Sequence, residues 1–118
     1  MTDSPISPVV DELWERRDDL TPEHLDARRE VVAAVDLLDT GQARVARVEQ
    51  DRVVVDERAK RAILLSFKVL PMVRGANGGF HVHDRVPLKT TFDGVRVVAG
   101  AIARWGSFFE PGVVLMPS

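Results

Sequence analysis

One arginine stands out among the residues whose chemistry can support a function. Arg96 lies in the Val-rich segment 94–98, where its guanidinium is surrounded by β-branched residues. A guanidinium held on a strand can bind a carboxylate through two parallel hydrogen bonds. The alternation of side chains along a strand also allows an outward, solvated Arg96 between Val95 and Val97. The spacing alone favours the solvated side chain and leaves carboxylate binding as the alternative.

Two histidines, His81 and His83, alternate along a predicted strand and therefore share one of its faces. A metal site would need a third ligand, which neither Asp84 nor His24 is placed to supply. The chain has no cysteine, which excludes disulfides, thiolate nucleophiles and cysteine metal sites. We therefore expect partly exposed strand histidines and no bound metal.

Other polar segments give no support for nucleotide binding or hydrolysis. The Gly-rich stretch 74–79 has neither the P-loop spacing nor the dinucleotide fingerprint, and we expect a loop or turn there. Ser66 and Ser107 have no histidine nearby in the sequence that would complete a triad. Asp36 and Asp39 have the positions of helix-surface or capping residues.

Helix signals dominate the first half of the chain. Ser7 offers a cap before Pro8, and apolar residues then recur at helical spacing. Thr21 opens a second helix start, and the apolar stripe that follows ends at Gly41 as a left-handed cap would end it. Because only the short link 18–21 separates the two segments, the sequence predicts a helical hairpin.

Strand and helix signals alternate in the middle of the chain. Residues 43–55 are rich in Val and broken by the polar stretch 49–52, which favours a strand-turn-strand hairpin. Asp56 can cap a third helix that Pro71 stops. Its expected core face carries Ala59, Ile63, Phe67 and Leu70, with Ala62, Leu65, Ser66 and Val69 beside them. Short strands are predicted over residues 80–88 and 95–98.

The last part of the chain divides into six-residue units that begin with Ala103, Phe109 and Leu115. Gly106 and Gly112 follow three positions into their units. This spacing is typical of a hexapeptide β-helix, in which every sixth side chain points into a shared apolar interior. One coil cannot bury its own inner face, so several must stack. Because the pattern begins shortly before the end, we expect the chain to be the front of a larger protein.

Composition bounds the class of protein. A chain of 118 residues with 45% hydrophobic and 29% charged residues suits one small globular domain. Its net charge of -2 gives no overall attraction for nucleic acid or an anionic membrane. No apolar run approaches the roughly 20 residues that a membrane span needs. The first residues have no basic n-region of a signal peptide, so we expect a cytoplasmic location.

Several segments, in the right order, carry a resemblance to a known family. Residues 62–68, Ala-Ile-Leu-Leu-Ser-Phe-Lys, resemble a Val-Leu-Leu-Ser-Phe-Arg helix of that family, and residues 84–89 resemble its Asp-Lys-Val-Pro-Met-Lys. Residues 94–98 and the final Val-Leu-Met-Pro-Ser complete the set. From about Leu13 to its end, the chain resembles the amino-terminal part of tetrahydrodipicolinate N-succinyltransferase, an enzyme of lysine and diaminopimelate biosynthesis.

The resemblance implies a homotrimer of left-handed parallel β-helices that transfers succinyl from succinyl-coenzyme A to the amine of ring-opened tetrahydrodipicolinate. An acidic side chain would act as the base. The matching arginine of the family contacts the dicarboxylate substrate, so Arg96 is the one site residue carried over. The catalytic acids and the coenzyme A groove of the family lie beyond Ser118. We therefore expect no catalytic, cofactor-binding or metal residue here, and a chain that is inactive alone.

The predicted fold is thus α+β: a helical hairpin, a β-hairpin, a third helix and short strands lead into the first coil of a truncated left-handed parallel β-helix. We assign residues 1–98 to an amino-terminal α/β domain and residues 99–118 to the start of the hexapeptide-repeat β-helix. The exposed side chains of Phe108, Phe109 and Leu115 on a partial coil predict self-association.

Two other functions stay open. One is a stand-alone interaction or assembly module without catalysis. Against it, a protein that had evolved to end here should carry a cap over the exposed edge of its solenoid, and the pattern instead stops abruptly. The other is a different hexapeptide-repeat acyltransferase, because that solenoid hosts several acyl acceptors. The helix at residues 62–68 and the Arg96 segment favour the succinyltransferase.

Overall fold

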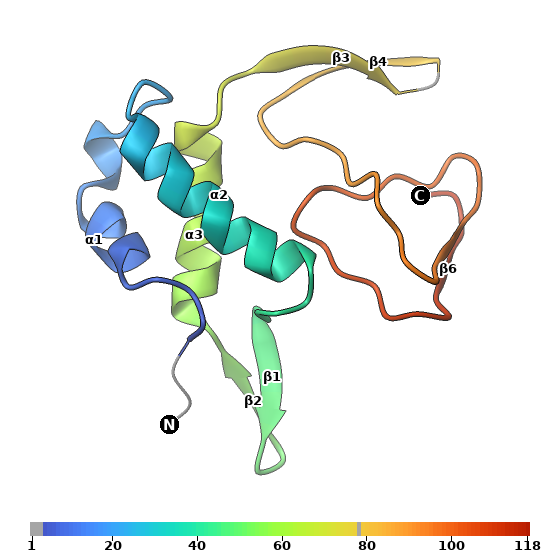
Figure 1. Cartoon of the computed structure of the whole chain (residues 1–118), viewed down its shortest axis with the longest axis horizontal. Coiled ribbons are helices and arrows are strands. Elements are labelled where there is room, and N and C mark those ends of the chain that lie inside the picture. The colour runs from blue at the N-terminus through green and yellow to red at the C-terminus, as the bar shows by residue number, and fades with distance from the viewer. Residues whose placement is uncertain (1–3, 78) are drawn as a thin grey trace.

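The structure is a computed structural model, and it describes residues 4–77 and 79–118. Three helices gather on one side of the molecule, two antiparallel hairpins extend from them, and the C-terminal part closes on itself at the other side (Figure 1). The fold is mixed α+β, as predicted. The elements are α1 (Val9–Glu15), a 3₁₀ helix (Arg17–Asp19), α2 (Leu25–Asp39), β1 (Ala46–Glu49), β2 (Arg52–Val55), α3 (Glu57–Val69), β3 (Val73–Asn77), β4 (Phe80–Asp84), β5 (Arg96–Val97) and β6 (Val114–Leu115).

The core lies where α1, α2 and α3 meet. Leu65 of α3 is fully buried, as are Val10 of α1 and Val31 of α2. The buried stripe of α3 differs from the predicted one, because Phe67 is 41% exposed and Ile63 is only partly buried. The buried residues of α3 are Ala59, Ala62, Leu65, Ser66 and Val69. The predicted face was partly wrong: Ala59 and Leu70 are buried as expected, but the buried stripe is shifted toward the residues predicted beside it, because α3 contacts both α1 and α2.

The helix starts follow local hydrogen bonds. Ser7 Oγ accepts a hydrogen bond of 3.2 Å from the Val9 backbone N–H, as a capping side chain would, but the residue directly before α1 is Pro8, which was predicted as the first helical residue. The predicted start of the second helix at Thr21 is wrong. The Thr21 N–H donates to His24 Nδ1 at 3.1 Å, and this bond closes a separate turn before α2 begins at Leu25. The prediction of a short link at residues 18–21 was also incomplete, because a 3₁₀ helix over Arg17–Asp19 occupies part of this segment.

The β1–β2 hairpin and the cap of α3 confirm the prediction for the middle of the chain. Val48 faces Val53 across the hairpin. The turn residues Gln50 and Asp51 have φ angles of 49° and 63°, the left-handed values of a tight hairpin turn. Asp56 Oδ1 accepts from the backbone N–H groups of Arg58 and Ala59 at 3.0 and 3.2 Å. Its side chain therefore caps α3.

The Gly-rich stretch 74–79 is mostly strand, whereas a loop or turn was predicted, and of its described residues only Gly79 lies in a turn. Residues 73–77 form β3, which pairs antiparallel with β4, and Gly75 lies opposite Val82. Residue 78 lies outside the described residues. The predicted strand over 80–88 is shorter than expected and ends at Asp84, whose Oδ1 accepts from the Arg85 N–H at 2.7 Å. This bond turns the chain away from β3.

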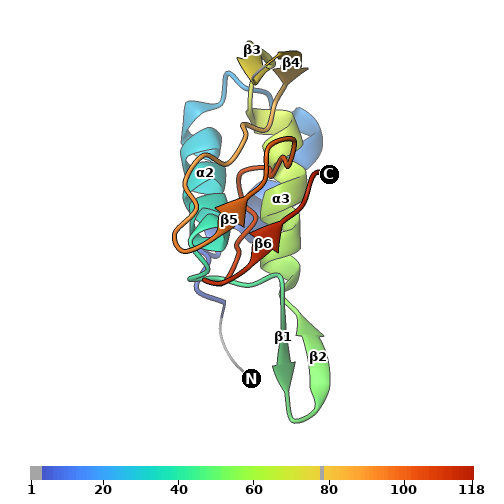
Figure 2. The ribbon, with the colours of Figure 1, turned by 90° about the vertical axis from the view of Figure 1, so that its right-hand side faces the viewer.

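Residues 94–118, which we name the C-terminal loop, close on themselves through a parallel strand pair. Arg96 of β5 lies opposite Val114 of β6, eighteen residues later (Figure 2). The glycines at 94, 100, 106 and 112 all have positive φ, so the six-residue spacing begins earlier than Gly106, the first glycine of the predicted pattern. At Gly94 a side chain would place its Cβ only 3.0 Å from Pro111, which adds a steric reason for glycine.

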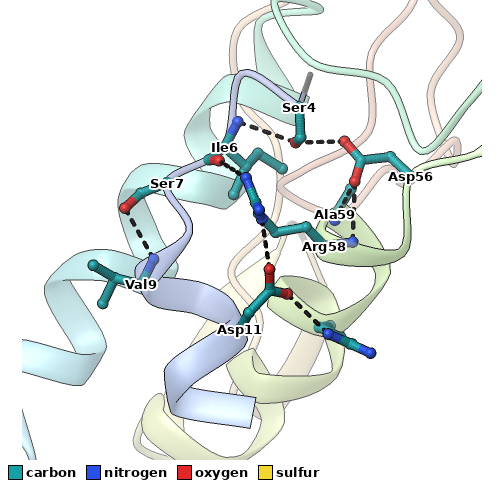
Figure 3. A network of polar contacts seen from close by, with 9 residues as sticks. Ser4, Ile6, Ser7, Val9, Asp11, Asp56, Arg58 and Ala59 are labelled. Atoms are coloured by element: carbon teal, nitrogen blue, oxygen red, sulfur yellow. Dashed lines mark hydrogen bonds and ion pairs between the residues drawn. The ribbon is translucent and has the colours of Figure 1, made fainter. Parts of the chain in front are cut away.

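A polar network fastens the N-terminal segment to α3 (Figure 3). Ser4 Oγ donates to Asp56 Oδ2 at 2.6 Å. Asp11 of α1 accepts from Arg58 Nε and from Arg61 Nη1, both at 2.9 Å. Partial burial of Asp11 opposes its ionisation, but the hydrogen bonds and charges of the two arginines outweigh it and lower the pKa of the carboxyl group.

Replacing Asp11 by asparagine should remove a pH-dependent part of the stability. A carboxyl whose pKa is lower in the folded chain stabilises it above the unfolded pKa of about 3.9, and this contribution is lost as the pH falls through the folded value. We expect Asp11→Asn to cost about 1 kcal/mol near neutral pH, measured by urea unfolding. In strong acid the two proteins should converge.

The control for this experiment is Asp26→Asn, which removes an ion pair of 3.6 Å whose carboxylate is 98% exposed. It should change stability little at any pH. A difference between Asp11→Asn and the original chain that stays constant into strong acid would contradict the role of the ionised Asp11.

Candidate functional site

Arg96 lies on the parallel pair of the C-terminal loop. Its backbone N–H donates to the Val113 carbonyl at 3.0 Å, which fixes the strand. Its side chain is exposed, and within residues 4–77 and 79–118 its guanidinium has neither an ion-pair nor a hydrogen-bond partner. The neighbouring Val97 lines a cavity of about 410 Å³ between the loop and the β3–β4 hairpin. Arg96 does not line that cavity. Because its guanidinium is exposed and without a partner among the described residues, its donors are available for an external carboxylate.

One carboxylate at the end of α2 holds the C-terminal loop in place. Asp39 Oδ1 accepts from Lys89 Nζ and from the Gly106 backbone N–H, both at 2.8 Å. Lys89 Nζ also donates to the Asp39 carbonyl at 2.8 Å. The Lys89 side chain is only 8% exposed, and Asp39 supplies the carboxylate that pairs with its ammonium. Asp39, predicted as a helix-surface or capping residue, is thus a structural link between two distant segments.

Further contacts from α2 and the chain after it support the same loop. Trp105 Nε1 donates to Asp36 Oδ1 at 2.8 Å. The Phe108 ring covers Gly41, where an added Cβ would come within 2.9 Å of the ring. The guanidinium of Arg44 lies 4.9 Å from the centroid of the same ring, and cation and ring attract each other at this distance. Gly41 therefore forms the left-handed cap that was predicted, and its lack of a side chain also leaves room for the Phe108 ring.

The aromatic residues of the loop are less exposed than predicted. Phe108 and Phe109 are both half-buried, and Phe109 packs on Phe92 with ring centroids 6.2 Å apart. Leu115 is also half-buried. The expectation of fully exposed side chains was therefore wrong, since Phe108 packs on Gly41 and Phe109 on Phe92.

The loop is tied to β4 as well. Arg104 Nη2 donates to Asp84 Oδ2 at 2.5 Å, and Arg104 also forms a backbone bridge with Leu88. The hydrogen bond from Arg104, together with the Arg85 backbone N–H, lowers the pKa of the Asp84 carboxyl. The C-terminal loop, and Arg96 on it, is therefore positioned from two sides.

The predicted histidine pair lies on β4, where His81 faces Ala76 and His83 faces Arg74. Among residues 4–77 and 79–118, no three His, Cys, Asp or Glu side chains gather as a metal site would require. Within the same described ranges, no helix combines the length and the apolar character that crossing a bilayer demands.

Comparison with known proteins gives the class. A family model described as Tetrahydrodipicolinate N-succinyltransferase N-terminal matches residues 5–69. The chain is 36% identical to a 2,3,4,5-tetrahydropyridine-2,6-dicarboxylate N-succinyltransferase of Pseudoalteromonas translucida, with 98% of this chain and 45% of the relative covered. Enzymes of the same name from Aeromonas hydrophila and Paraburkholderia phymatum are 38% and 40% identical, each over 96% of this chain and 45% of the relative.

These relatives are acyl-transferring enzymes, and the α+β fold described above corresponds to the N-terminal part of such a transferase. The chain belongs to the tetrahydrodipicolinate N-succinyltransferase family. It spans less than half the length of the curated relatives it matches.

Proposed function

We propose that this chain is the N-terminal part of an enzyme that transfers a succinyl group from succinyl-coenzyme A to the amine of ring-opened tetrahydrodipicolinate. The observation that carries the proposal is the similarity of 96–98% of the chain to enzymes named for this reaction. The enzyme would serve lysine and diaminopimelate biosynthesis in the cytoplasm. The resemblance implies that the catalytic acids and the coenzyme A groove would lie in the later part of the enzyme, so the 118-residue chain alone would be inactive.

The C-terminal loop would be one coil of a left-handed parallel β-helix. A register of eighteen residues between β5 and β6 equals three six-residue units, the length of one such coil. The positive-φ glycines at 94, 100, 106 and 112 support the same period. We propose the division into an α/β domain, residues 1–98, and the start of the β-helix, residues 99–118, with residues 94–98 as the strand on which the coil closes.

We further propose that the complete enzyme is a homotrimer. The support for this proposal is the resemblance to the family, whose members assemble as trimers of left-handed β-helices. Further coils of the same chain would stack on the strand pair of β5 and β6 in each subunit. Grooves between neighbouring β-helices would then hold succinyl-coenzyme A. Nucleic acid is not among the proposed partners, given the net charge of -2.

Arg96 would bind a carboxylate of the dicarboxylate substrate. Its guanidinium is exposed, and no carboxylate of the described part of the chain competes for it. A guanidinium binds a carboxylate through two hydrogen bonds that fix both position and orientation. The backbone bond from Arg96 to Val113 and the link at Asp39 would hold the strand that carries Arg96 in place for that contact.

A chimera tests the proposed function. This chain is joined in frame to the part of the Aeromonas hydrophila enzyme that follows the matched region. We expect release of coenzyme A thiol only when both succinyl-coenzyme A and tetrahydrodipicolinate are present. A chimera that is folded and assembles like the parent enzyme, yet releases no thiol, would contradict the proposal.

In this chimera, Arg96→Gln should lower kcat/KM for the dicarboxylate about 100-fold, because it removes a charge-assisted pair worth about 3 kcal/mol. The KM for succinyl-coenzyme A should be unchanged. Arg96→Lys should recover part of the loss. The matched control is Arg52→Gln, an exposed arginine on β2. Equal losses from Arg96→Gln and Arg52→Gln, or none from either, would exclude Arg96 from the substrate site.

A further inference from the structure

A second hollow lies beside the β3–β4 hairpin and shares Gly75, Val82 and Leu88 with the first. It has a volume of about 550 Å³ and is enclosed by the hairpin, the end of α3, Arg28 of α2 and the segment 84–88. This volume falls within the roughly 300–1,000 Å³ of small-molecule sites. Much of its wall is apolar, from Leu70, Val73, Val82, Val86 and Leu88.

Three arginines from three separate segments line the same hollow: Arg28 of α2, Arg74 of β3 and Arg85 after β4. Each of the seven ion pairs identified in the described part of the chain uses a cation outside this hollow. None of these three guanidiniums therefore forms an ion pair with a carboxylate of the described residues.

Two of these arginines are held by neutral backbone groups. Arg85 Nη1 donates to the Leu70 carbonyl at 2.6 Å, and Arg28 Nη1 donates to the Pro22 carbonyl at 3.5 Å. Carbonyl oxygens orient a guanidinium without cancelling its charge. The acid in the wall, Asp84, is already engaged by Arg104 at 2.5 Å. The guanidiniums of Arg85 and Arg28 are thus oriented by backbone carbonyls, and neither forms an ion pair with a carboxylate of the described residues.

A hollow whose wall is largely apolar and carries three guanidiniums without ion pairs is suited to a ligand that is both apolar and anionic. We propose that this hollow binds a small organic anion with an apolar body, the anionic head facing Arg28, Arg74 and Arg85. The apolar body displaces water from the wall, and the head receives charge-assisted hydrogen bonds. This proposal is separate from the transfer reaction and does not depend on it.

Titration of the 118-residue chain, followed by the amide resonances in ¹H–¹⁵N spectra, tests the proposal. Hexanoate is the probe, because it combines a carboxylate with an apolar body. Acetate lacks the body, and 1-hexanol and hexylammonium lack the negative charge. We expect hexanoate alone to give saturable shifts, and these should cluster on β3, β4 and residues 84–88.

Two variants locate the anionic head. Arg74→Gln and Arg28→Gln should each weaken hexanoate binding about tenfold, the loss expected for one charge-assisted hydrogen bond. The control Arg52→Gln removes an exposed charge on β2, outside the hollow, and should leave the affinity unchanged. Dispersed spectra of all three variants establish that they are folded.

Three outcomes would overturn the proposal. The first is no saturable shift with hexanoate. The second is equal shifts with hexylammonium, which would indicate apolar binding without anion recognition. The third is a loss of affinity in Arg52→Gln as large as that in Arg74→Gln, which would indicate a general effect of net charge.

Discussion

Leu65→Ala should destabilise the chain by about 3 kcal/mol, a large part of the roughly 5–15 kcal/mol that holds a typical small domain folded. The Leu65 side chain is fully buried on α3, where the three helices meet. Its removal leaves a cavity that the surrounding helices can fill only in part. Urea unfolding followed by circular dichroism measures the loss.

Leu64→Ala is the matched control for this change. Leu64 is the same residue type on the same helix, one position earlier, but it is 43% exposed. Its replacement should cost about 1 kcal/mol or less, because little buried surface is lost. Equal effects of the two replacements would mean that α3 does not pack with the face described here.

Asp39→Ala should cost about 3 kcal/mol and release the C-terminal loop from α2. The change leaves the ammonium of Lys89, whose side chain is 8% exposed, without its carboxylate, and the Gly106 N–H without its acceptor. The free-energy cost of a buried charge without a partner exceeds the stabilisation that the intact ion pair provided. Urea unfolding gives the stability, and hydrogen exchange of the loop amides reports its release.

Lys89→Met completes a double-mutant cycle with Asp39→Ala. The double variant should be more stable than Asp39→Ala alone, because no unpaired ammonium remains. Asp26→Ala is the control, since it breaks a surface pair of 3.6 Å and should change stability by less than about 1 kcal/mol. Additive effects of Asp39→Ala and Lys89→Met would show that the two side chains do not depend on each other.

Features set by near neighbours in the sequence could be predicted. The caps at Ser7 and Asp56 depend on hydrogen bonds to backbone groups two or three residues away. The left-handed cap at Gly41 and the hairpin turn at residues 50–51 follow from local backbone preferences. The start of α2 was missed because the ring of His24 competes for the Thr21 N–H and forms a turn instead.

Features set by distant contacts could not be predicted from local patterns. The stretch that became β3 has the composition of a turn, and its strand conformation comes from pairing with β4. Asp39 bonds Lys89 and Gly106, which are fifty and sixty-seven residues away, so nothing near Asp39 marks its role. The balance of charge around Arg28 and Arg74 likewise emerges only when separate segments meet.

The sequence identified Arg96 as a candidate site residue from its chemistry, but it did not predict which residues surround its side chain. Both interpretations of Arg96 agree in part with the structure, because its side chain is outward and exposed, and it is also without a protein carboxylate. Its role in binding the substrate stays a prediction. The sequence pattern indicates the six-residue period from Gly106 onward, while Gly94 and Gly100 reveal their part only through their positive φ angles.

The proposed transferase role depends on the C-terminal loop being a closed coil that presents Arg96. The most direct test is a search for nuclear Overhauser effects between the backbone of Val97 and that of Leu115 in the folded chain. The parallel register predicts such effects, together with slow exchange of the Arg96 and Val98 amides, whose carbonyl partners lie at 3.0 Å. Sequential effects alone, with fast exchange throughout residues 94–118, would contradict the coil and the site built on it.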